Sequence, residues 1–181
     1  MTSCPPDESL TKPLSIETDR LQIRWLHAED AEFIYHLVND PDWIRFIGNK
    51  NVSNLDEART YLETGPLVMY QEQGFGLNRV ALKADNVPVG LCGLLKRESI
   101  DDIELGFAFL PEHRNQGYAY EAASAVLENG RTVHHLSRLA AILAVDNIPS
   151  RHLLKKLGFE FKKSFHMEPN ADILDLYLMD L

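Results

Sequence analysis

Residues 102–123 read DIELGFAFLPEHRNQGYAYEAA, and this stretch decides the fold that we expect for the chain. Its first part sets one carboxylate, Glu104, among aliphatic and aromatic side chains, which predicts a strand. A loop that starts with proline follows, and a helix is predicted from about Gly117. Small and apolar residues then recur at helical spacing, at Ala119, Ala122, Ala123, Val126 and Leu127.

The loop before this helix has features of an anion-binding site. A helix N-terminus offers unpaired main-chain N–H groups and the positive end of the helix dipole. Gly117 would let a ligand approach the backbone closely, and Arg114 would add a positive charge beside it. On these residues alone, a plain turn is the commoner explanation for a glycine at a helix start.

The common phosphate-binding patterns do not occur in the chain. Neither G-x-x-x-x-G-K-[ST] nor G-x-G-x-x-G is present. Their absence argues against a P-loop NTPase and against a dinucleotide-binding protein.

A second segment, residues 147–159, reads NIPSRHLLKKLGF. It strengthens the interpretation of residues 114–119 as an anion-binding loop. Together they resemble the signature motifs of the GNAT superfamily of acyl-CoA N-acyltransferases, in which residues 114–119 (RNQGYA) match the [RQ]-x-x-G-x-[GA] loop. The branch that the chain most resembles is the RimJ/RimL-like group of ribosomal-protein N-terminal acetyltransferases. The matches to that branch are TDRL at 18–21 and DIELG at 102–106. The resemblance extends from Leu14 to the end of the chain.

The resemblance implies a fold and a coenzyme. The fold is a single α/β (α+β) GNAT domain over residues 14–181, in which a mostly antiparallel sheet splays open near its centre and is flanked by helices. Residues 1–13 are expected to be a flexible N-terminal tail. The coenzyme is acetyl-CoA, lying in the splay with its pyrophosphate on the backbone of residues 116–119. The implied coenzyme-binding residues are Phe107, Ala108, Phe109, Arg114, Asn115, Gln116, Gly117, Tyr118, Ala119, Asn147 and Ser150.

The resemblance also implies how some of these residues act. The central strand would carry a bulge, with a main-chain N–H near Phe107 or Ala108 facing the thioester carbonyl. The edge of that strand would pair with the pantetheine arm, as a peptide adds to a sheet. Asn147 would hydrogen-bond the pantetheine amides, because an amide side chain both donates and accepts.

Acetyl transfer to an amine requires a neutral acceptor. An α-amino group with a pKa of about 7.7–8.0 is partly neutral at pH 7, whereas a lysine-like amine with a pKa of about 10.4 needs a base. Glu104 is the best candidate for that base, directly or through a water. The alternative is that Glu104 points to solvent from an alternating strand.

The coenzyme leaves as a thiolate, which may take up a proton. Because a thiol has a pKa of about 8.5, the demand on the proton donor is small. Many GNAT enzymes use a tyrosine, but the corresponding residue here is Leu154. Ser150 is the replacement candidate and the second predicted catalytic residue. Its alternative role is to cap or steady the helix that follows Asn147.

The acceptor site is expected between two helices near the N-terminus. One helix is predicted over 29–39, and a capping box at Ser53-x-x-Asp56 predicts the start of the other. The segment 43–51 between them should be irregular. By resemblance, Trp43, Arg45 and Phe46 would contact the substrate together with Glu104, although the two aromatic rings would also suit a core that pins the segment.

The rest of the chain predicts a strand over 16–26, with Arg20 in a structural ion pair, and a short helix over 67–73. A hairpin is predicted at 77–84 and 89–96, where Gly90 and Gly93 indicate a bulge or a close backbone approach. Further strands are expected at 138–145, 159–165 and 173–179. Asn129 and Gly130 should fall inside the long helix, at some cost in helix propensity.

Composition limits the class of protein. The 181 residues suit one domain, and 45% hydrophobic with 25% charged residues is ordinary for a globular chain. A net charge of −9 without a basic face argues against a nucleic-acid partner. That charge is compatible with a cationic acceptor, or it only aids solubility. No apolar run is long enough to span a membrane.

Cysteine and histidine usage adds little chemistry. The two cysteines, Cys4 and Cys92, form no disulfide framework, which fits a reducing cytoplasm. Cys92 is expected in the core, and His134 and His135 are expected to be a solvated pair rather than a metal site.

The sequence therefore predicts an acetyl-CoA-dependent N-acetyltransferase that moves an acetyl group to a primary amine by direct attack in a ternary complex. The acceptor is either a protein N-terminus or a small-molecule amine. The alternative is a sensor module that binds acyl-CoA without turnover, and a nucleotide-binding α/β protein is disfavoured. Because relatives often pair, a homodimer is also expected.

Overall fold

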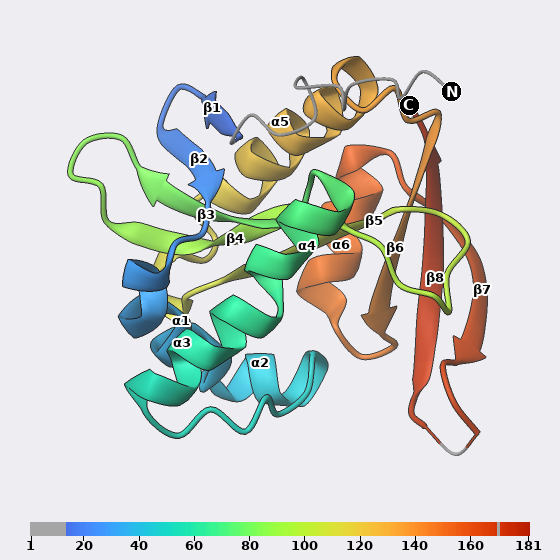
Figure 1. The fold of residues 1–181 in the computed structure, drawn as a ribbon. Coiled ribbons are helices and arrows are strands. Elements are labelled where there is room, and N and C mark those ends of the chain that lie inside the picture. The colour runs from blue at the N-terminus through green and yellow to red at the C-terminus, as the bar shows by residue number, and fades with distance from the viewer. Residues whose placement is uncertain (1–13, 170) are drawn as a thin grey trace, which may run out of the picture.

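One sheet organises the part of the chain that the computed structural model describes, residues 14–169 and 171–181 (Figure 1). Its strand order is β1-β2-β3-β4-β5-β6-β8-β7. The predicted tail, residues 1–13 with Cys4, lies outside the described residues. In chain order the elements are β1 (Ser15–Glu17), β2 (Leu21–Trp25), η2 (Ala28–Asp30), α1 (Ala31–Val38), α2 (Pro41–Phe46), α3 (Leu55–Thr64), α4 (Pro66–Gln73), β3 (Leu77–Leu82), β4 (Pro88–Leu95), β5 (Glu104–Phe109), η3 (Pro111–His113), α5 (Tyr118–Thr132), β6 (Arg138–Ala144), α6 (Ile148–Leu157), β7 (Glu160–His166) and β8 (Ile173–Asp180).

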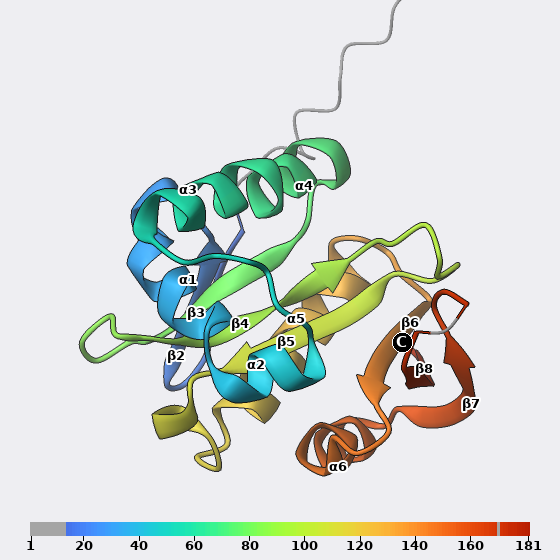
Figure 2. The same cartoon turned by 90° about the horizontal axis from the view of Figure 1, so that it is seen from below.

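The sheet parts at its one parallel pair of strands. All other neighbouring strands are antiparallel, and β4 pairs with β5 from Glu104 to Phe109. In contrast, β5 and β6 pair at a single position, Glu104 with Ala140. Beside it, the Ala140 N–H donates a hydrogen bond to the Ile103 carbonyl at 2.8 Å. Beyond that point β6, β8 and β7 turn away (Figure 2). The prediction of a mostly antiparallel, splayed sheet is confirmed.

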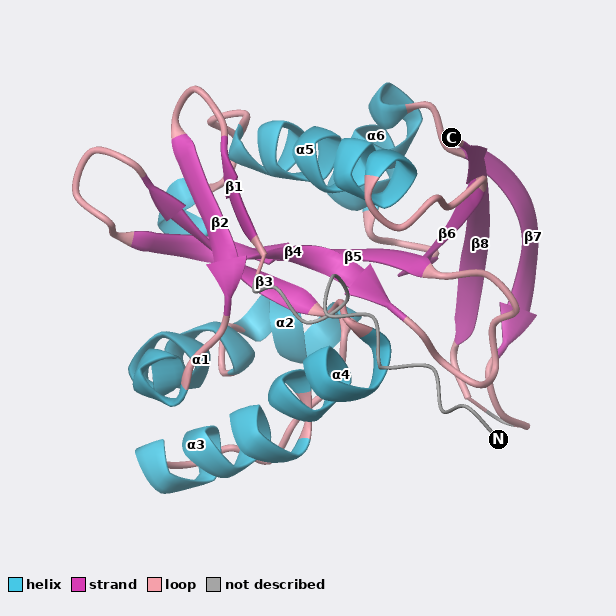
Figure 3. Ribbon diagram, turned by 45° about the horizontal axis from the view of Figure 1, so that its top comes forward, coloured by secondary structure: helices cyan, strands magenta, loops and turns pink. Residues whose placement is uncertain are grey.

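Helices cover both faces of the sheet. Figure 3 shows α5 and α6 on one side and α1 to α4 on the other. The predicted apolar face of α5 packs into the first core through Ala122, Ala123 and Val126. A second core lies under α1 and α3, around Ile34 and Leu62. None of the described helices is long and apolar enough to cross a membrane.

The predicted strand over 16–26 is in fact a hairpin. β1 and β2 pair with each other, and residues 18–20 make the turn between them. In that turn the Thr18 N–H donates to the Leu21 carbonyl, and the Leu21 N–H donates to the Thr18 hydroxyl oxygen, at 2.9 and 3.0 Å. A threonine side chain that satisfies its own turn is a weak sequence signal inside an otherwise strand-like run.

The segment 43–51 is not irregular throughout, because α2 occupies its first part. The Asp40 side chain caps this helix by accepting from the Trp43 N–H at 3.1 Å, and Pro41 takes the first helical position. Asp40 and Pro41 come directly after the helix predicted over 29–39, and an X-Pro pair commonly marks a helix end. The same residues are a good N-cap and a good N1 residue, so they also start a helix.

The start of α3 is displaced by one residue from the prediction. Asn54, rather than Ser53, is the N-cap, and its side chain accepts from the Glu57 N–H at 2.9 Å. Ser53 instead donates both its N–H and its hydroxyl to the Glu57 carboxylate, each at 2.6 Å. Two adjacent cap-forming residues made the choice ambiguous from sequence alone.

Gly90 and Gly93 mark close approaches of neighbouring backbones. A Cβ on Gly93 would lie 2.0 Å from the Gly76 carbonyl oxygen, and one on Gly90 would lie 2.5 Å from that of Ala108. The register shifts between Val80 and Ala81 of β3, which pair with Gly90 and Pro88, so the extra residue is Val89 of β4, directly beside Gly90. The bulge expected in the central strand is absent from the described register of β4 and β5, which stays continuous because the glycines remove the side chains that would collide.

A buried carboxylate ties the strands to the first helices. Arg24 donates to both oxygens of Asp30 at 2.7 and 2.8 Å, and the Nε of Arg79 lies 3.3 Å from Asp30. Burial alone would raise the pKa of Asp30, but hydrogen bonds from Arg24 and the His27 N–H lower it overall. The charged form of Asp30 therefore stabilises the fold.

We predict that Asp30→Asn lowers the free energy of unfolding at pH 7 by about 3 kcal/mol, because it leaves two cations without their buried partner. Urea denaturation measures this. Since the folded-state pKa is lowered, the contribution is present above about pH 4 and is lost as the pH falls further, so the two proteins should converge in acid. Asp56→Asn, at an exposed carboxylate in α3, is the control and should change little. Equal effects of the two substitutions would contradict the prediction.

Candidate functional site

The start of α5 presents main-chain N–H groups at the surface. Gly117 has a φ of +84°, in the left-handed region that glycine adopts without strain, and no side chain of the described residues caps the helix. Asn115, Gln116 and Gly117 are exposed, whereas Tyr118 and Ala119 are half-buried. The first turn of this helix is therefore open to an anion from solvent.

Arg114 does not extend along this loop. Its Nε donates to the Phe109 carbonyl at 2.8 Å, and its two terminal nitrogens are paired with Asp40, at 2.6 Å, and with Asp42. The guanidinium therefore fastens the loop to the start of α2. The positive charge that the sequence placed beside the loop is balanced by carboxylates that lie far from it in the chain.

On the side of β5 that faces the splay, only every second residue presents its main-chain N–H and carbonyl groups. The Leu110 N–H donates to the Val89 carbonyl at 2.9 Å, so alternation directs the main-chain groups of Ala108 toward β4. Those of Phe107 and Phe109 are directed toward the splay, and the Phe109 carbonyl is taken by Arg114. Of the two predicted oxyanion donors, the geometry favours Phe107 and disfavours Ala108.

Glu104 lies where the two strands begin to part. It is only 1% exposed, and its Oε1 has no hydrogen-bond partner among the described residues. The nearest cation is Arg97, whose Nε is 3.6 Å from Oε1. Burial raises the pKa of Glu104, against smaller opposing effects of Arg97 and Lys96. The solvent-facing alternative is wrong, because the carboxyl group is buried and more basic than usual.

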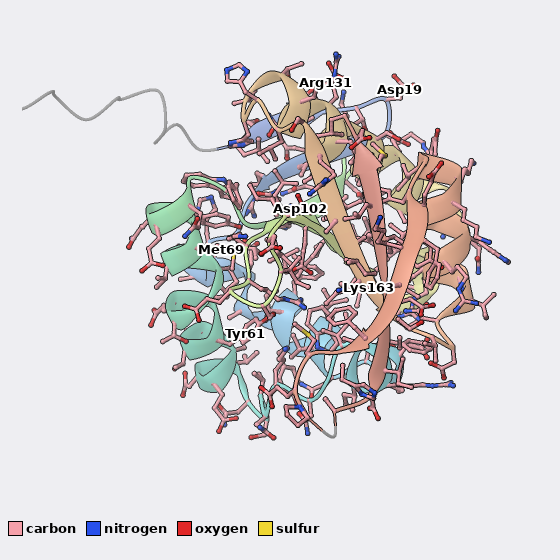
Figure 4. All side chains as sticks on the ribbon, turned by 90° about the vertical axis from the view of Figure 1, so that its right-hand side faces the viewer. Asp19, Tyr61, Met69, Asp102, Arg131 and Lys163 are labelled. Carbon is pink, nitrogen blue, oxygen red and sulfur yellow. The ribbon has the colours of Figure 1, made fainter. Side chains whose placement is uncertain are left out.

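Arg97 lies beside Glu104 on one side of the splay. It extends from the β4–β5 loop, and its Nη1 lies 4.0 Å from the sulfur of Met167 in the β7–β8 turn. Partial burial, and then the charge of Arg97, lower the pKa of Lys50. Figure 4 shows this side of the molecule, where the loop carrying Asp102 runs between the helices of Tyr61 and Met69 and the strand of Lys163. Arg97 is thus the cation that lies beside Glu104 on this side.

The three predicted acceptor residues have different environments. Trp43 is 4% exposed and packs in the second core, so it pins the segment as the alternative interpretation had it. Arg45 is exposed, stacks over the half-buried Phe46 ring at 4.8 Å, and pairs with Asp146 at 2.7 Å. That ion pair joins α2 to the loop after β6, across the splay. Arg45 and Phe46 are therefore at its entrance.

Asn147 and Ser150 lie at the start of α6. The Asn147 Oδ1 accepts from the Ser150 N–H at 3.2 Å, so Asn147 is the cap of this helix and keeps its amide NH₂ group for a ligand. The half-buried Ser150 makes no side-chain hydrogen bond with the described residues. Ser150 is thus not the capping side chain, and its hydroxyl can still donate. Leu154 is a core residue at 1% exposure.

The remaining polar candidates lie away from the splay in structural environments. No cluster of three or more metal-ligating side chains occurs within the described ranges. His134 is half-buried against the Phe75 ring, 5.5 Å between centroids, whereas His135 is exposed. Cys92 is fully buried, as predicted, which raises the pKa of its thiol.

Known proteins are similar to this chain in sequence and in fold. The family model of an acetyltransferase (GNAT) domain matches residues 20–160. An uncharacterised N-acetyltransferase of Bacillus subtilis (strain 168), YoaA, is 30% identical over 147 residues, which is 80% of this chain and 82% of YoaA.

Two solved structures illustrate the shared fold. A GNAT-family acetyltransferase from Bacillus anthracis is 25% identical and superposes with a TM-score of 0.77, covering 92% of this chain and 98% of that one. RimL, a ribosomal L7/L12 α-N-protein acetyltransferase solved in complex with coenzyme A, has a TM-score of 0.79 at 16% identity, with 93% and 98% coverage. At that identity RimL is similar in fold.

We predict that Glu104→Gln raises the free energy of unfolding at neutral pH, because it removes a charge from a buried site. The folded-state pKa is raised, so the unfolded carboxyl ionises first as the pH rises past about 4.3, and the wild type loses stability from there upward. The stability gain should therefore be small at pH 4 and larger at pH 8 in urea denaturation. Glu128→Gln, on an exposed ion pair of α5, is the control. A variant that is less stable than the wild type at pH 8 would contradict this.

Proposed function

The chain belongs to the acetyltransferase (GNAT) family, and on that premise we propose that Glu104 is the base through which it acetylates a primary amine. The protein is an N-acetyltransferase that depends on acetyl-CoA, which supplies the acetyl group as a thioester. The observation that carries the proposal is the buried Glu104 carboxyl group, with one oxygen unpartnered where β5 and β6 part. Such an oxygen can accept a proton from the acceptor, directly or through a water.

The residues around the splay fit the coenzyme. The exposed turn at Gly117 suits a diphosphate, and a Cβ there would stand 3.2 Å from the Arg20 guanidinium, so only glycine leaves that side of the loop unfilled. The main-chain edge at Phe107 and the free amide NH₂ of Asn147 offer hydrogen bonds on either side of the splay. Asn115, Gln116, Tyr118 and Ala119 contribute backbone at the same helix start.

Phe107 and Ser150 complete the proposed chemistry. The Phe107 N–H is the main-chain donor available to a carbonyl oxygen that gains negative charge. The Ser150 hydroxyl, which has no partner among the described residues, is the group of α6 that can give a proton to the leaving sulfur. Since a thiol pKa is about 8.5, a weak donor suffices there.

We propose that the acceptor is the N-terminal amine of a protein. An α-amine with a pKa of about 7.7–8.0 needs only a modest base, whereas a lysine-like amine needs a much stronger one. A carboxyl group with a raised pKa matches the weaker demand. The fold similarity to RimL, which is named for acetylating an α-amino group, supports the RimJ/RimL-like assignment. Arg45 and Phe46, at the entrance, are the proposed acceptor contacts.

We also place the reaction in the cytoplasm. The chain has only two cysteines, and Cys92 is a buried free thiol, both of which suit a reducing compartment.

The proposed function predicts thiol release from acetyl-CoA that depends on an added amine. Peptides with a free N-terminus should stimulate release more than the same peptides blocked at that end, and small amines provide the comparison. Glu104→Gln should lower kcat/KM by about 10²–10⁴-fold, as expected for loss of a general base. Glu128→Gln is the control. Coenzyme binding with no release for any acceptor would support a sensor instead, and full activity of Glu104→Gln would overturn the assignment of the base.

The loop assignment has its own prediction. Gly117→Glu should abolish coenzyme A binding in calorimetry, because the new side chain fills the turn and repels the diphosphate. Val133→Glu adds the same charge at the other, exposed end of α5 and should leave the Kd unchanged. Circular dichroism checks that both variants are folded. Unchanged affinity of the Gly117 variant would refute the loop.

A further inference from the structure

An acidic side chain lies in the first turn of the helix that would bind the diphosphate. Glu121 is in the first turn of α5, and its side chain is 17% exposed. A carboxylate there is favourable for the helix dipole but opposes a second anion at the same N-terminus. A diphosphate can therefore bind well only if the charge of Glu121 is balanced.

The β1–β2 turn provides that balance. The Arg20 Nε donates to Oε2 of Glu121 at 2.7 Å, and the Arg20 main-chain N–H donates to Oε1 at 2.8 Å. The Thr18 hydroxyl donates to the same Oε1 at 2.5 Å. Burial by itself would raise the pKa of Glu121, but these hydrogen bonds lower it, so the group is a carboxylate at neutral pH. The structural ion pair predicted for Arg20 is thus present, with a partner about a hundred residues away in the chain.

The same guanidinium also holds the loop. Its Nη1 donates to the Gln116 carbonyl at 2.9 Å, and its carbon lies 4.6 Å from the centre of the Tyr118 ring. Because a trans peptide unit is planar, its carbonyl and its N–H point in opposite directions. A Gln116 carbonyl fixed on Arg20 therefore turns the Gly117 N–H to the other side of the loop.

We infer that Arg20 is a positioning residue for the coenzyme's diphosphate, an inference that rests on the proposed function. It orients the peptide between Gln116 and Gly117, and it neutralises the carboxylate of Glu121. Arg114, the cation that the motif itself contains, cannot do either while Asp40 and Asp42 hold it. The positive charge beside the start of α5 therefore comes from Arg20 in the β1–β2 turn, which lies outside the loop motif of residues 114–119.

The test is a double-mutant cycle with Arg20→Gln and Glu121→Gln, read by calorimetry with coenzyme A. Arg20→Gln should raise the Kd about tenfold or more, the scale of one lost charge-assisted hydrogen bond. Glu121→Gln should lower the Kd, since Arg20 is then unopposed. The double variant should recover part of the loss, because the unpaired carboxylate is gone while the Gln116 carbonyl stays unanchored.

Two further measurements separate positioning from general damage. With S-acetylpantetheine, which lacks the diphosphate, kcat/KM should be the same for the wild type and Arg20→Gln, and kcat with acetyl-CoA should also hold. Arg20→Lys should rescue only in part, since an ammonium group cannot reproduce the guanidinium's several directed bonds. Arg131→Gln removes the same charge from the last turn of α5 and should leave the Kd unchanged.

Each outcome has one meaning. A wild type that binds no coenzyme A would overturn the proposed function itself. A wild type that binds it while Arg20→Gln binds equally well would overturn the inference alone. Equal losses with acetyl-CoA and S-acetylpantetheine would also overturn it, because they would show general loosening. If the double variant recovered nothing, neutralisation of Glu121 would be refuted.

Discussion

The parting of β5 from β6 is the constraint on which the rest of the structure depends. Two parallel strands that share one register pair expose main-chain donors and acceptors in the middle of a sheet, where such groups are normally paired. We propose that this opening is the coenzyme site, because an extended ligand can pair with the free edge at Phe107 as a strand would. The carboxyl group of Glu104 lies at the apex of the same opening, so the binding edge and the reactive group come from one strand.

Charges from distant segments shape the ends of this opening. Arg114 is held by the acidic start of α2, Arg45 reaches Asp146 across the splay, and Arg20 holds the loop before α5. The exposed Arg45–Asp146 pair contributes little to stability, because water screens it. The effect of all three contacts is on geometry, since each one joins parts of the chain that the sheet alone leaves apart.

Glu104 shows a conflict between stability and chemistry. A carboxyl group at 1% exposure, with a guanidinium at 3.6 Å and an unpartnered oxygen, is poorly compensated for its burial. The same burial raises its proton affinity, which is what a base requires. A side chain that weakens the fold in this way is typical of a functional residue rather than a structural one.

Much of the fold and the family followed from local patterns in the sequence. The period of apolar residues identified most helices and strands. The segments at 102–123 and 147–159 led to the GNAT resemblance. Such motifs can be recognised in a sequence because they describe local structure, such as the backbone turn at Gly117. Helix starts were less certain, as Asp40 with Pro41 and Ser53 with Asn54 show, since neighbouring cap-forming residues compete. The tertiary structure was required for three other findings. These are the hydrogen-bond partners of Arg114, Arg20 and Asn147, the burial of Glu104, and the choice of Phe107 over Ala108 as the main-chain donor. They depend on which distant segments meet and on strand register, and neither is encoded in any one stretch of sequence.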